Sequence, residues 1–339
     1  MSYDKILKDL KQKAPPELND HILVIDAMNM LIRSFSLLKA MSPTGHHIGG
    51  LVGFLRSLGY VTRIFEPTRV IIVWDGKGGS ANRKNIDPNY KANRATSRIT
   101  HWGLYDTKAE ETEALIGQLF RTKDYLDCLP VQQIMMEKLE ADDIIAYLAL
   151  QADKNNKKIT IISSDKDFLQ LVNKNIEVYA PVKKRTLTAD NIKEELKVIP
   201  ENYNIVKALL GDNSDGLKGV KGLGIKTIVS EFPDLVTKPG MTLDYVFETC
   251  EKQLEGRKIF AKIIHEWDKV ETNYELMNLH ESVLDLKEKN TILDIIKEDI
   301  PDLQSGAFLH LLDHDRIEGV TKNTEGWLEN FRGLTVFKK

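Results

Sequence analysis

Hydrophobic positions in this chain form two kinds of segment that alternate over the first half of the sequence. Three short runs are continuously apolar and rich in Val and Ile: "ILVI" at 22–25, "VIIVW" at 70–74 and "ITII" at 159–162. Runs of this kind are typical of strands that are buried on both faces of a parallel sheet. A further strand is expected within 131–138.

Between these runs, apolar residues recur at helical spacing in the segments 49–65, 109–127 and 142–156. Alternating strands and helices predict an α/β fold, with a doubly wound parallel sheet flanked by helices. Residues 245–339 have the pattern of charged amphipathic helices. We expect this region either to complete the core or to dock a partner protein.

Composition narrows the class of protein. The chain has 339 residues, of which 42% are hydrophobic and 29% charged, as expected for a folded domain. The sequence contains no run of 18 apolar residues, so no membrane span is predicted. The N-terminus lacks the apolar core of a secretory signal. The two cysteines, Cys128 and Cys250, are far apart and indicate neither a disulfide framework nor a Cys-based zinc site. We expect a cytoplasmic protein.

The charges are sorted along the chain, although the net charge of −3 does not indicate a nucleic-acid-binding protein. Basic residues concentrate at 77–98, at 182–186 and in the lysines of 218–226. Acidic residues concentrate at 140–143, where "EADD" precedes an apolar helical pattern. Acids in a first helical turn interact well with the helix dipole, but this explains only one or two of them.

Carboxylates also follow each predicted strand. Because the carboxyl ends of parallel strands meet at one edge of a sheet, we expect these side chains to gather there. A further pair lies in "GDNSDG", and the two acids share one helical face if that turn is helical. The full set is Asp26, Asp75, Glu140, Asp142, Asp143, Asp165, Asp167, Asp212 and Asp215.

So many acids in one place repel each other, by about 4 kcal/mol for a pair 4 Å apart at an effective dielectric of 20. Divalent cations remove this difficulty, and hard Mg²⁺ or Mn²⁺ prefers oxygen ligands. Two such ions can hold a phosphodiester, activate a water molecule and stabilise the leaving oxygen. The acids therefore predict a metal site.

The glycine-rich stretch "GLKGVKGLGIKTI" at 216–228 predicts a tight turn between two helices. It is not a P-loop, because Ile225 occupies the position at which that motif needs lysine. Backbone N–H groups of the turn are expected to hold a phosphate, and Lys218, Lys221 and Lys226 to add charge without reading base sequence.

Taken together, the motifs resemble those of the 5′-nuclease family, which includes flap endonucleases and the 5′-nuclease domain of DNA polymerase I. They span about 21–232 and read "IDAMNMLIRSF", "SPTGHHIGGLVGFLRSL", "VIIVWDGKGG", "NYKANR", "LEADDIIAYLA", "IISSDKDFLQLV" and "LLGDNSDGLKGVKGLGIKT". The resemblance implies a PIN-like core at 21–200 after an N-terminal extension at 1–20. It further implies a helical arch at about 78–108, a helix-hairpin-helix region at 201–240 and a C-terminal helical region at 241–339.

The same resemblance implies roles for individual residues. The nine acids would bind two or more Mg²⁺ ions, with Mn²⁺ as a substitute, and a K⁺ ion would bind the hairpin. Lys91, Arg94 and Asp165 would be catalytic, the Tyr90 ring would stack on a base, and Arg33 would contact phosphate. The hairpin would bind duplex DNA through Lys218, Gly219, Lys221, Gly222, Gly224, Lys226 and Thr227. Roles for Arg83 and Lys84 stay undefined, because the lead-in to the arch differs from that of the polymerase-linked members.

The expected function is that of a free-standing, metal-dependent 5′-3′ exonuclease and flap endonuclease, acting as a monomer. Its substrates would be 5′ flaps, 5′ ends and RNA–DNA hybrids, and a single-strand-binding protein is a candidate partner. One alternative is a phosphatase of the haloacid dehalogenase type, which needs a DxD motif after its first strand, where this chain has a lone Asp26. Another is a non-catalytic junction-binding protein, although none of the acids is missing. We expect His46, His47 and His101 to be surface residues.

Overall fold

The computed structural model describes residues 15–92, 100–101, 103–317 and 320–338, and a six-stranded sheet lies at its centre. The strand order is β3-β2-β1-β4-β5-β6, with every neighbouring pair parallel except β5 and β6. The predicted α/β fold with a parallel sheet is thus confirmed, with one antiparallel strand at its edge. The strands are β1 His21–Asp26, β2 Arg69–Trp74, β3 Gln132–Met135, β4 Lys158–Ile162, β5 Ile176–Ala180 and β6 Arg185–Leu187.

Side chains of the central strands alternate between two hydrophobic cores. In β1, Ile22 and Val24 belong to one core, whereas Leu23 and Ile25 belong to the other. All four are at most 5% exposed. Burial on both faces explains why these strands are continuously apolar in the sequence, because neither face meets water.

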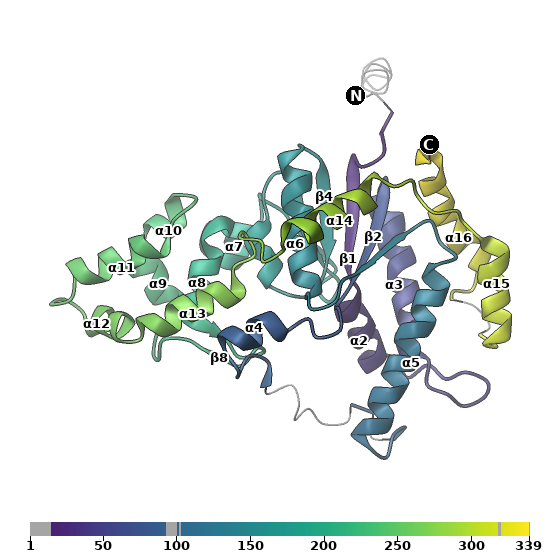
Figure 1. Ribbon diagram of the computed structural model, residues 1–339, viewed down its shortest axis with the longest axis horizontal. Helices are drawn as coiled ribbons and strands as arrows, with labels where there is room; N and C mark the ends of the chain where they lie inside the picture. Colours follow the sequence, from purple (N-terminus) through teal and green to yellow (C-terminus); the bar gives the residue numbers. More distant parts are fainter. Residues whose placement is uncertain (1–14, 93–99, 102, 318–319, 339) are drawn as a thin grey trace.

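Two layers of helices cover the sheet (Figure 1). One core is closed by α6 and by helices of the later chain, and the other by α2, α3, α5, α15 and α16. The predicted helices at 49–65, 109–127 and 142–156 are confirmed to within two residues. The helices of the first 200 residues are α2 Ala27–Leu37, α3 Gly49–Phe65, α4 Ala81–Ile86, α5 Lys108–Leu126, α6 Ala141–Lys154, the 3-10 helix η2 Asp167–Leu171 and α7 Ile192–Leu196.

A group of short elements extends from the sheet beyond α7 (Figure 1). Helices lie on both sides of the glycine-rich stretch, as predicted, but its residues 217–218 form a strand and its residues 225–228 already belong to the second helix. The segment around Asp212 and Asp215 is not helical, however, because residues 211–218 form a two-stranded antiparallel hairpin. The elements here are η3 Pro200–Asn202, α8 Tyr203–Leu210, β7 Gly211–Asp212, β8 Leu217–Lys218, α9 Ile225–Glu231, α10 Asp234–Thr237, α11 Leu243–Lys252, α12 Lys258–His265 and α13 Trp267–Met277.

The C-terminal region completes the core, which was one of its two expected roles. Phe308, Trp327 and Phe331 are buried against α3 and α5. Arg69, only 1% exposed, donates from Nη2 to the carbonyl of Glu298 at 2.9 Å and so fixes the chain that leads there. The elements are α14 Leu286–Lys297, α15 Ser305–His314, α16 Thr324–Arg332 and η4 Gly333–Phe337.

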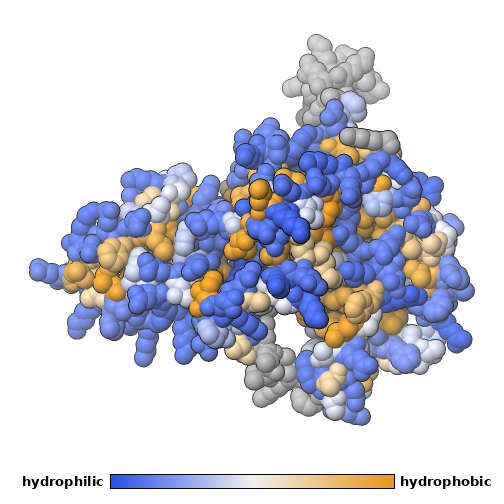
Figure 2. All heavy atoms as spheres, viewed as in Figure 1, coloured by the Kyte–Doolittle hydropathy of each residue, from blue (hydrophilic) through white to orange (hydrophobic). Residues whose placement is uncertain are grey.

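The visible surface of the protein is largely polar (Figure 2). The face drawn in Figure 2 is mostly hydrophilic, with several hydrophobic patches, among them one near its centre. Within the part of the chain that the structure describes, no helix has the length and apolar character needed to cross a bilayer.

Candidate active site

Asp26 and the loop after β4 meet at the carboxyl edge of the sheet. Asp26 ends β1 and caps α2, accepting from the Asn29 N–H at 3.0 Å and from the Ser163 hydroxyl at 2.8 Å. The Ser163 hydroxyl in turn accepts from the Asp165 N–H at 3.0 Å. Asp165 accepts from the Asp167 N–H at 2.9 Å. Hydrogen bonds therefore hold the three acids at one edge, as the strand pattern predicted.

Asp75 connects the end of β2 to the start of α6. Its Oδ1 accepts from the Ala141 N–H at 2.8 Å, which satisfies one of the open donors of the helix. Gly76 is required beside it, because a Cβ there would lie 1.7 Å from the Met136 carbonyl oxygen. This close approach brings the acidic start of α6 next to the end of β2.

Two acids at this edge, Asp26 and Asp142, carry charge that the fold does not favour. Burial raises the pKa of Asp26 well above its usual range, and the nearby charges of Asp75 and Asp165 add to the shift. Burial and the charges of Asp165 and Asp26 likewise raise the pKa of Asp142. A cation at this point would reverse both shifts, so the carboxylates fit a divalent ion.

The geometry leaves room for water around such an ion. In the described ranges, no group of three or more His, Cys, Asp or Glu side chains converges closely enough to hold a metal by itself. Mg²⁺ usually keeps several waters and takes one or two carboxylates directly. A cavity of about 560 Å³ beside Asp165 and Asp212 is lined by Asn29, Lys166 and Tyr203 among others, and offers that space.

Glu140 and Asp143, also in the predicted metal set, bind basic side chains in this structure. Arg83 donates to both carboxylates, from Nη1 to Glu140 Oε2 at 2.9 Å and from Nη2 to Asp143 Oδ1 at 2.7 Å. Lys91 Nζ lies 2.9 Å from Glu140 Oε1. Burial alone would raise the pKa of Glu140, but Arg83 and Lys91 lower it.

Lys207 was not predicted from the sequence, yet it lies between two of the predicted metal ligands. It is 5% exposed and pairs with Asp167 and, at 2.7 Å, with Asp212 Oδ2. Burial opposes ionisation of Asp212, but hydrogen bonds from Lys207 and Ser214 outweigh it and lower the pKa of Asp212 to about 2. The sequence feature that indicates this role is the place of Lys207 on the buried face of α8, five residues before Asp212.

Residues of the expected arch are placed only in part. Tyr90 is 2% exposed and packs with Leu217, Leu276 and Met277, so its ring is not open to a base in this structure. The Lys91 N–H donates to the carbonyl of Asp215 at 2.8 Å, which joins the arch base to the 211–218 hairpin. Arg94 lies outside the described residues. Arg33 lies on α2, and its Nε is buried without a hydrogen-bond partner.

The glycine-rich turn is open to solvent. Lys218, Lys221 and Lys226 are exposed, as are Gly222 and Gly224, whereas Gly219 and Thr227 are half-buried. Gly222 adopts a φ of 84°, a left-handed conformation that favours glycine. Lys262 of α12 donates to the carbonyl of Lys221 and adds a positive charge to those of the three predicted lysines.

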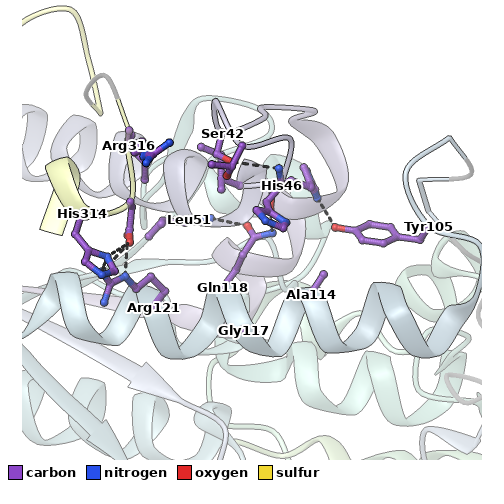
Figure 3. A pocket seen from close by; sticks show the side chains of 15 residues that line it. Ser42, His46, Leu51, Tyr105, Ala114, Gly117, Gln118, Arg121, His314 and Arg316 are labelled. Atoms are coloured by element: carbon purple, nitrogen blue, oxygen red, sulfur yellow. Dashed lines mark hydrogen bonds and ion pairs between the residues drawn. The ribbon is translucent and has the colours of Figure 1, made fainter.

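A separate cavity of about 630 Å³ lies between α5, the 42–48 loop and the chain after α15 (Figure 3). His47 is buried beside it, bonded through Nδ1 to the Tyr105 hydroxyl and through Nε2 to the Leu38 carbonyl. His101 is also buried, 4.8 Å from His47 between ring centroids. The expectation that both are surface histidines is wrong: His47 anchors the 38–48 loop, and His101 Nε2 bonds to the Phe35 carbonyl of α2. His46 is exposed, as expected.

A parallel sheet with acids at its carboxyl edge, basic groups at an arch base and a lysine-bearing hairpin defines a nuclease-type α/β protein. The model of the 5′-3′ exonuclease N-terminal resolvase-like domain matches residues 21–197. The chain belongs to the 5′-3′ exonuclease family. It is a 5′-nuclease, an enzyme that hydrolyses phosphodiester bonds, and the phosphatase and non-catalytic alternatives are not favoured.

Individual relatives agree with this family. The chain is 27% identical to a 5′-3′ exonuclease of Bacillus subtilis over 319 residues, covering 91% of this chain and 97% of the relative. It is 26% identical to a 5′-3′ exonuclease of Aquifex aeolicus, covering 86% and 95%. The fold is similar to that of the bacteriophage T5 flap endonuclease, solved as a pseudo-enzyme–product complex with DNA and metal ions. That match has a TM-score of 0.63 at 21% identity and covers 82% of this chain and all of the other.

Proposed function

We propose that this protein is a divalent-metal-dependent 5′-3′ exonuclease and flap endonuclease that cuts DNA near the junction of a single strand and a duplex. The proposal is supported by the raised pKa of Asp26, which is buried, and of Asp142, which is half-buried; each is raised by desolvation and by the charges of neighbouring acids, among them Asp165. These carboxyls can all be ionised at neutral pH only if a cation lies beside them. Mg²⁺ is the proposed ion, with Mn²⁺ as a substitute.

The acids divide by their surroundings. Asp26, Asp75, Asp142 and Asp165 are proposed to hold the first ion, because burial raises the pKa of Asp26 and Asp142 and the charges of neighbouring acids in this set add to both shifts. Asp167, Asp212 and Asp215 are proposed to serve a second ion, although Lys207 occupies the first two of them here. Such ions would supply a nucleophilic hydroxide and stabilise the leaving oxygen.

DNA is proposed to lie across the carboxyl edge of the sheet and the glycine-rich turn. Exposed lysines 218, 221 and 226, together with Lys262, would contact duplex phosphates without reading base sequence. Gly219, Gly222, Gly224 and Thr227 would let the DNA backbone approach closely. Lys91, Arg94 and Arg33 would contact the phosphate that is cut or its neighbour.

The remaining expectations also belong to this proposal. We infer action on 5′ flaps, 5′ ends and RNA–DNA hybrids, a K⁺ ion at the turn, and a monomer with a single-strand-binding protein as a candidate partner. A cytoplasmic location is supported by Cys128 and Cys250, which are free, buried thiols.

The test is cleavage of a 5′-labelled flap duplex in Mg²⁺, beside EDTA and the Asp165→Asn variant. Cleavage near the junction that disappears in both controls, with flap binding kept in Ca²⁺, is the expected result. Binding without cleavage by the unmodified protein would instead identify a junction-binding module, and no binding would reopen the phosphatase alternative.

A further inference from the structure

The carboxylate of Glu140 is fully occupied by side chains of the arch base. Oε1 accepts from the Ser80 hydroxyl at 2.6 Å and from Lys91 Nζ at 2.9 Å. Oε2 accepts from Arg83 Nη1 at 2.9 Å and from the Tyr90 hydroxyl at 3.2 Å. A carboxylate has about four lone-pair sites, so four donors leave none for a metal ion. Glu140 is only 3% exposed, which also leaves no room for water.

The three guanidinium nitrogens of Arg83 all donate hydrogen bonds within the protein. Its Nε donates to the Leu276 carbonyl at 3.0 Å, and its two Nη atoms reach Asp143 at 2.9 and 2.7 Å as well as Glu140. With Arg83 and Lys91 cationic and Glu140 and Asp143 anionic, the group has no net charge. This compensation is what a buried set of charges requires.

Asp142, which lies between these two acids in sequence, has different surroundings. Arg83 and Lys91 pair with its two neighbours, Glu140 and Asp143, whereas Asp142 belongs to the four acids proposed for the first ion. The start of α6 therefore presents Asp142 to the proposed ion, while Glu140 and Asp143 point to the arch base.

We propose that Glu140 and Arg83 are positioning residues that hold Lys91 beside the cleavage site, and that Glu140 and Asp143 do not bind a metal ion. This proposal rests on the proposed nuclease function and revises the expected metal set. It assigns to Arg83 a role that does not require contact with DNA, since its side chain is only 9% exposed.

Lys91 is held at both ends. Its backbone adopts a φ of 57°, a left-handed conformation that is unfavourable for lysine, and its N–H bond to the Asp215 carbonyl fixes that conformation. Glu140 fixes the ammonium group at the other end. A lysine placed before the substrate arrives saves the entropy of ordering it during the reaction.

The experiment compares Glu140→Gln, Asp143→Asn and Asp142→Asn with the unmodified protein and with Glu137→Gln, an exposed control three residues upstream of Glu140. Mn²⁺ affinity is measured by calorimetry on the full chain without DNA. Single-turnover cleavage of the flap duplex is measured at saturating DNA. A Lys91→Ala variant and the Lys91→Ala, Glu140→Gln double variant complete a double-mutant cycle.

The proposal predicts that Mn²⁺ affinity falls in Asp142→Asn and stays unchanged in Glu140→Gln, Asp143→Asn and the control. Cleavage by Glu140→Gln should fall by about 10- to 100-fold, the usual effect of removing a supporting contact. Since Glu140 acts through Lys91, the double variant should be no slower than Lys91→Ala alone. Additive losses, or loss of Mn²⁺ affinity in Glu140→Gln or Asp143→Asn, would overturn the proposal.

Different results would contradict the proposed nuclease function and the positioning role of Glu140. If the unmodified protein does not cleave the flap in Mg²⁺, the proposed function is wrong. If it cleaves while Glu140→Gln loses Mn²⁺, only the positioning role is wrong. If Glu140→Gln does not fold, the Mn²⁺ affinity of Asp143→Asn tests whether the arch-base acids bind a metal ion. Arg83→Lys then takes the place of Glu140→Gln in the double-mutant cycle with Lys91→Ala.

Discussion

The ammonium group of Lys207 lies 2.7 Å from Oδ2 of Asp212, at a point where the sequence predicts metal ligands. Lys207 also pairs with Asp167, and its side chain is 7% exposed. One lysine thus balances two acids of the proposed second ion site. A divalent cation that used these acids would have to displace the ammonium group or share the acids with it.

Replacing Lys207 by methionine should destabilise the metal-free protein by about 3 kcal/mol, because it leaves two largely buried carboxylates without their partner. The same change should increase the stabilisation that Mn²⁺ gives. Chemical unfolding in EDTA and in Mn²⁺ measures both effects. The control is Lys252→Met, whose exposed pair with Glu248 should contribute little. Equal effects of the two variants would contradict the role of Lys207.

Replacing Asp26 by asparagine should stabilise the metal-free protein while abolishing cleavage. Because the folded protein raises the pKa of Asp26 above its unfolded value of 3.8, ionisation of this group opposes folding. Its contribution to stability is therefore lost as pH rises from about 4 through the folded pKa. At neutral pH the substitution should raise the unfolding free energy by at most about 4 kcal/mol, since a pKa rise from 3.8 to about 7 spans about three pKa units of about 1.4 kcal/mol each.

Unfolding of the Asp26→Asn variant in EDTA at several pH values checks this prediction. The gain should shrink toward pH 4, where the native carboxyl is already protonated. Mg²⁺ should stabilise the unmodified protein more than the variant. A variant that is less stable than the parent at neutral pH in EDTA would show that the Asp26 carboxylate has compensating partners.

His21 should make the protein sensitive to mild acid. Burial and the charge of Lys158 lower the pKa of His21 from 6.5 to about 4, and its Nε2 lies 2.8 Å from the Thr160 hydroxyl. The unfolded chain thus binds a proton at a pH where the folded protein does not. Stability should fall as pH drops from 6.5 to 4, by at most about 3 kcal/mol from this group.

Comparing the pH dependence of unfolding for the parent, His21→Gln and His46→Gln isolates this effect. His46 is exposed and serves as the control. The slope between pH 6.5 and 4 should decrease only in His21→Gln. An unchanged slope would mean that His21 is protonated in the folded state without loss of stability.

Gly59 should not tolerate a side chain, because α3 and α16 touch there. A Cβ at Gly59 would lie 2.0 Å from Trp327 Nε1. We expect Gly59→Ala to destabilise the protein by about 1–3 kcal/mol, the usual range for overpacking. Gly117→Ala on α5 is the matched control, with no atom within 4 Å of the new Cβ, and should stabilise by about 0.5–1 kcal/mol. Thermal unfolding distinguishes the two, and equal changes would contradict the contact.

The sequence by itself determined the sheet and the gathering of the acids. Continuous apolar runs such as "VIIVW" can only be buried on both faces, and parallel strands necessarily present their carboxyl ends at one edge. Asp26, Asp75 and Asp165 were therefore predictable from position alone. The helical spacing at 49–65 was equally local information, because one buried stripe defines a helix.

Only the tertiary structure decided which acids are paired. Glu140, Asp142 and Asp143 have the same charge and adjacent positions, and nothing in their spacing separates a metal ligand from a partner of Arg83. Neither the pairing of Lys207 nor the burial of Tyr90 could be predicted from the sequence, since both depend on segments far along the chain. His47 and His101 are buried by contacts that helical or strand periodicity does not encode. The local sequence pattern determines the element on which a residue lies, and long-range packing determines which side chains contact it.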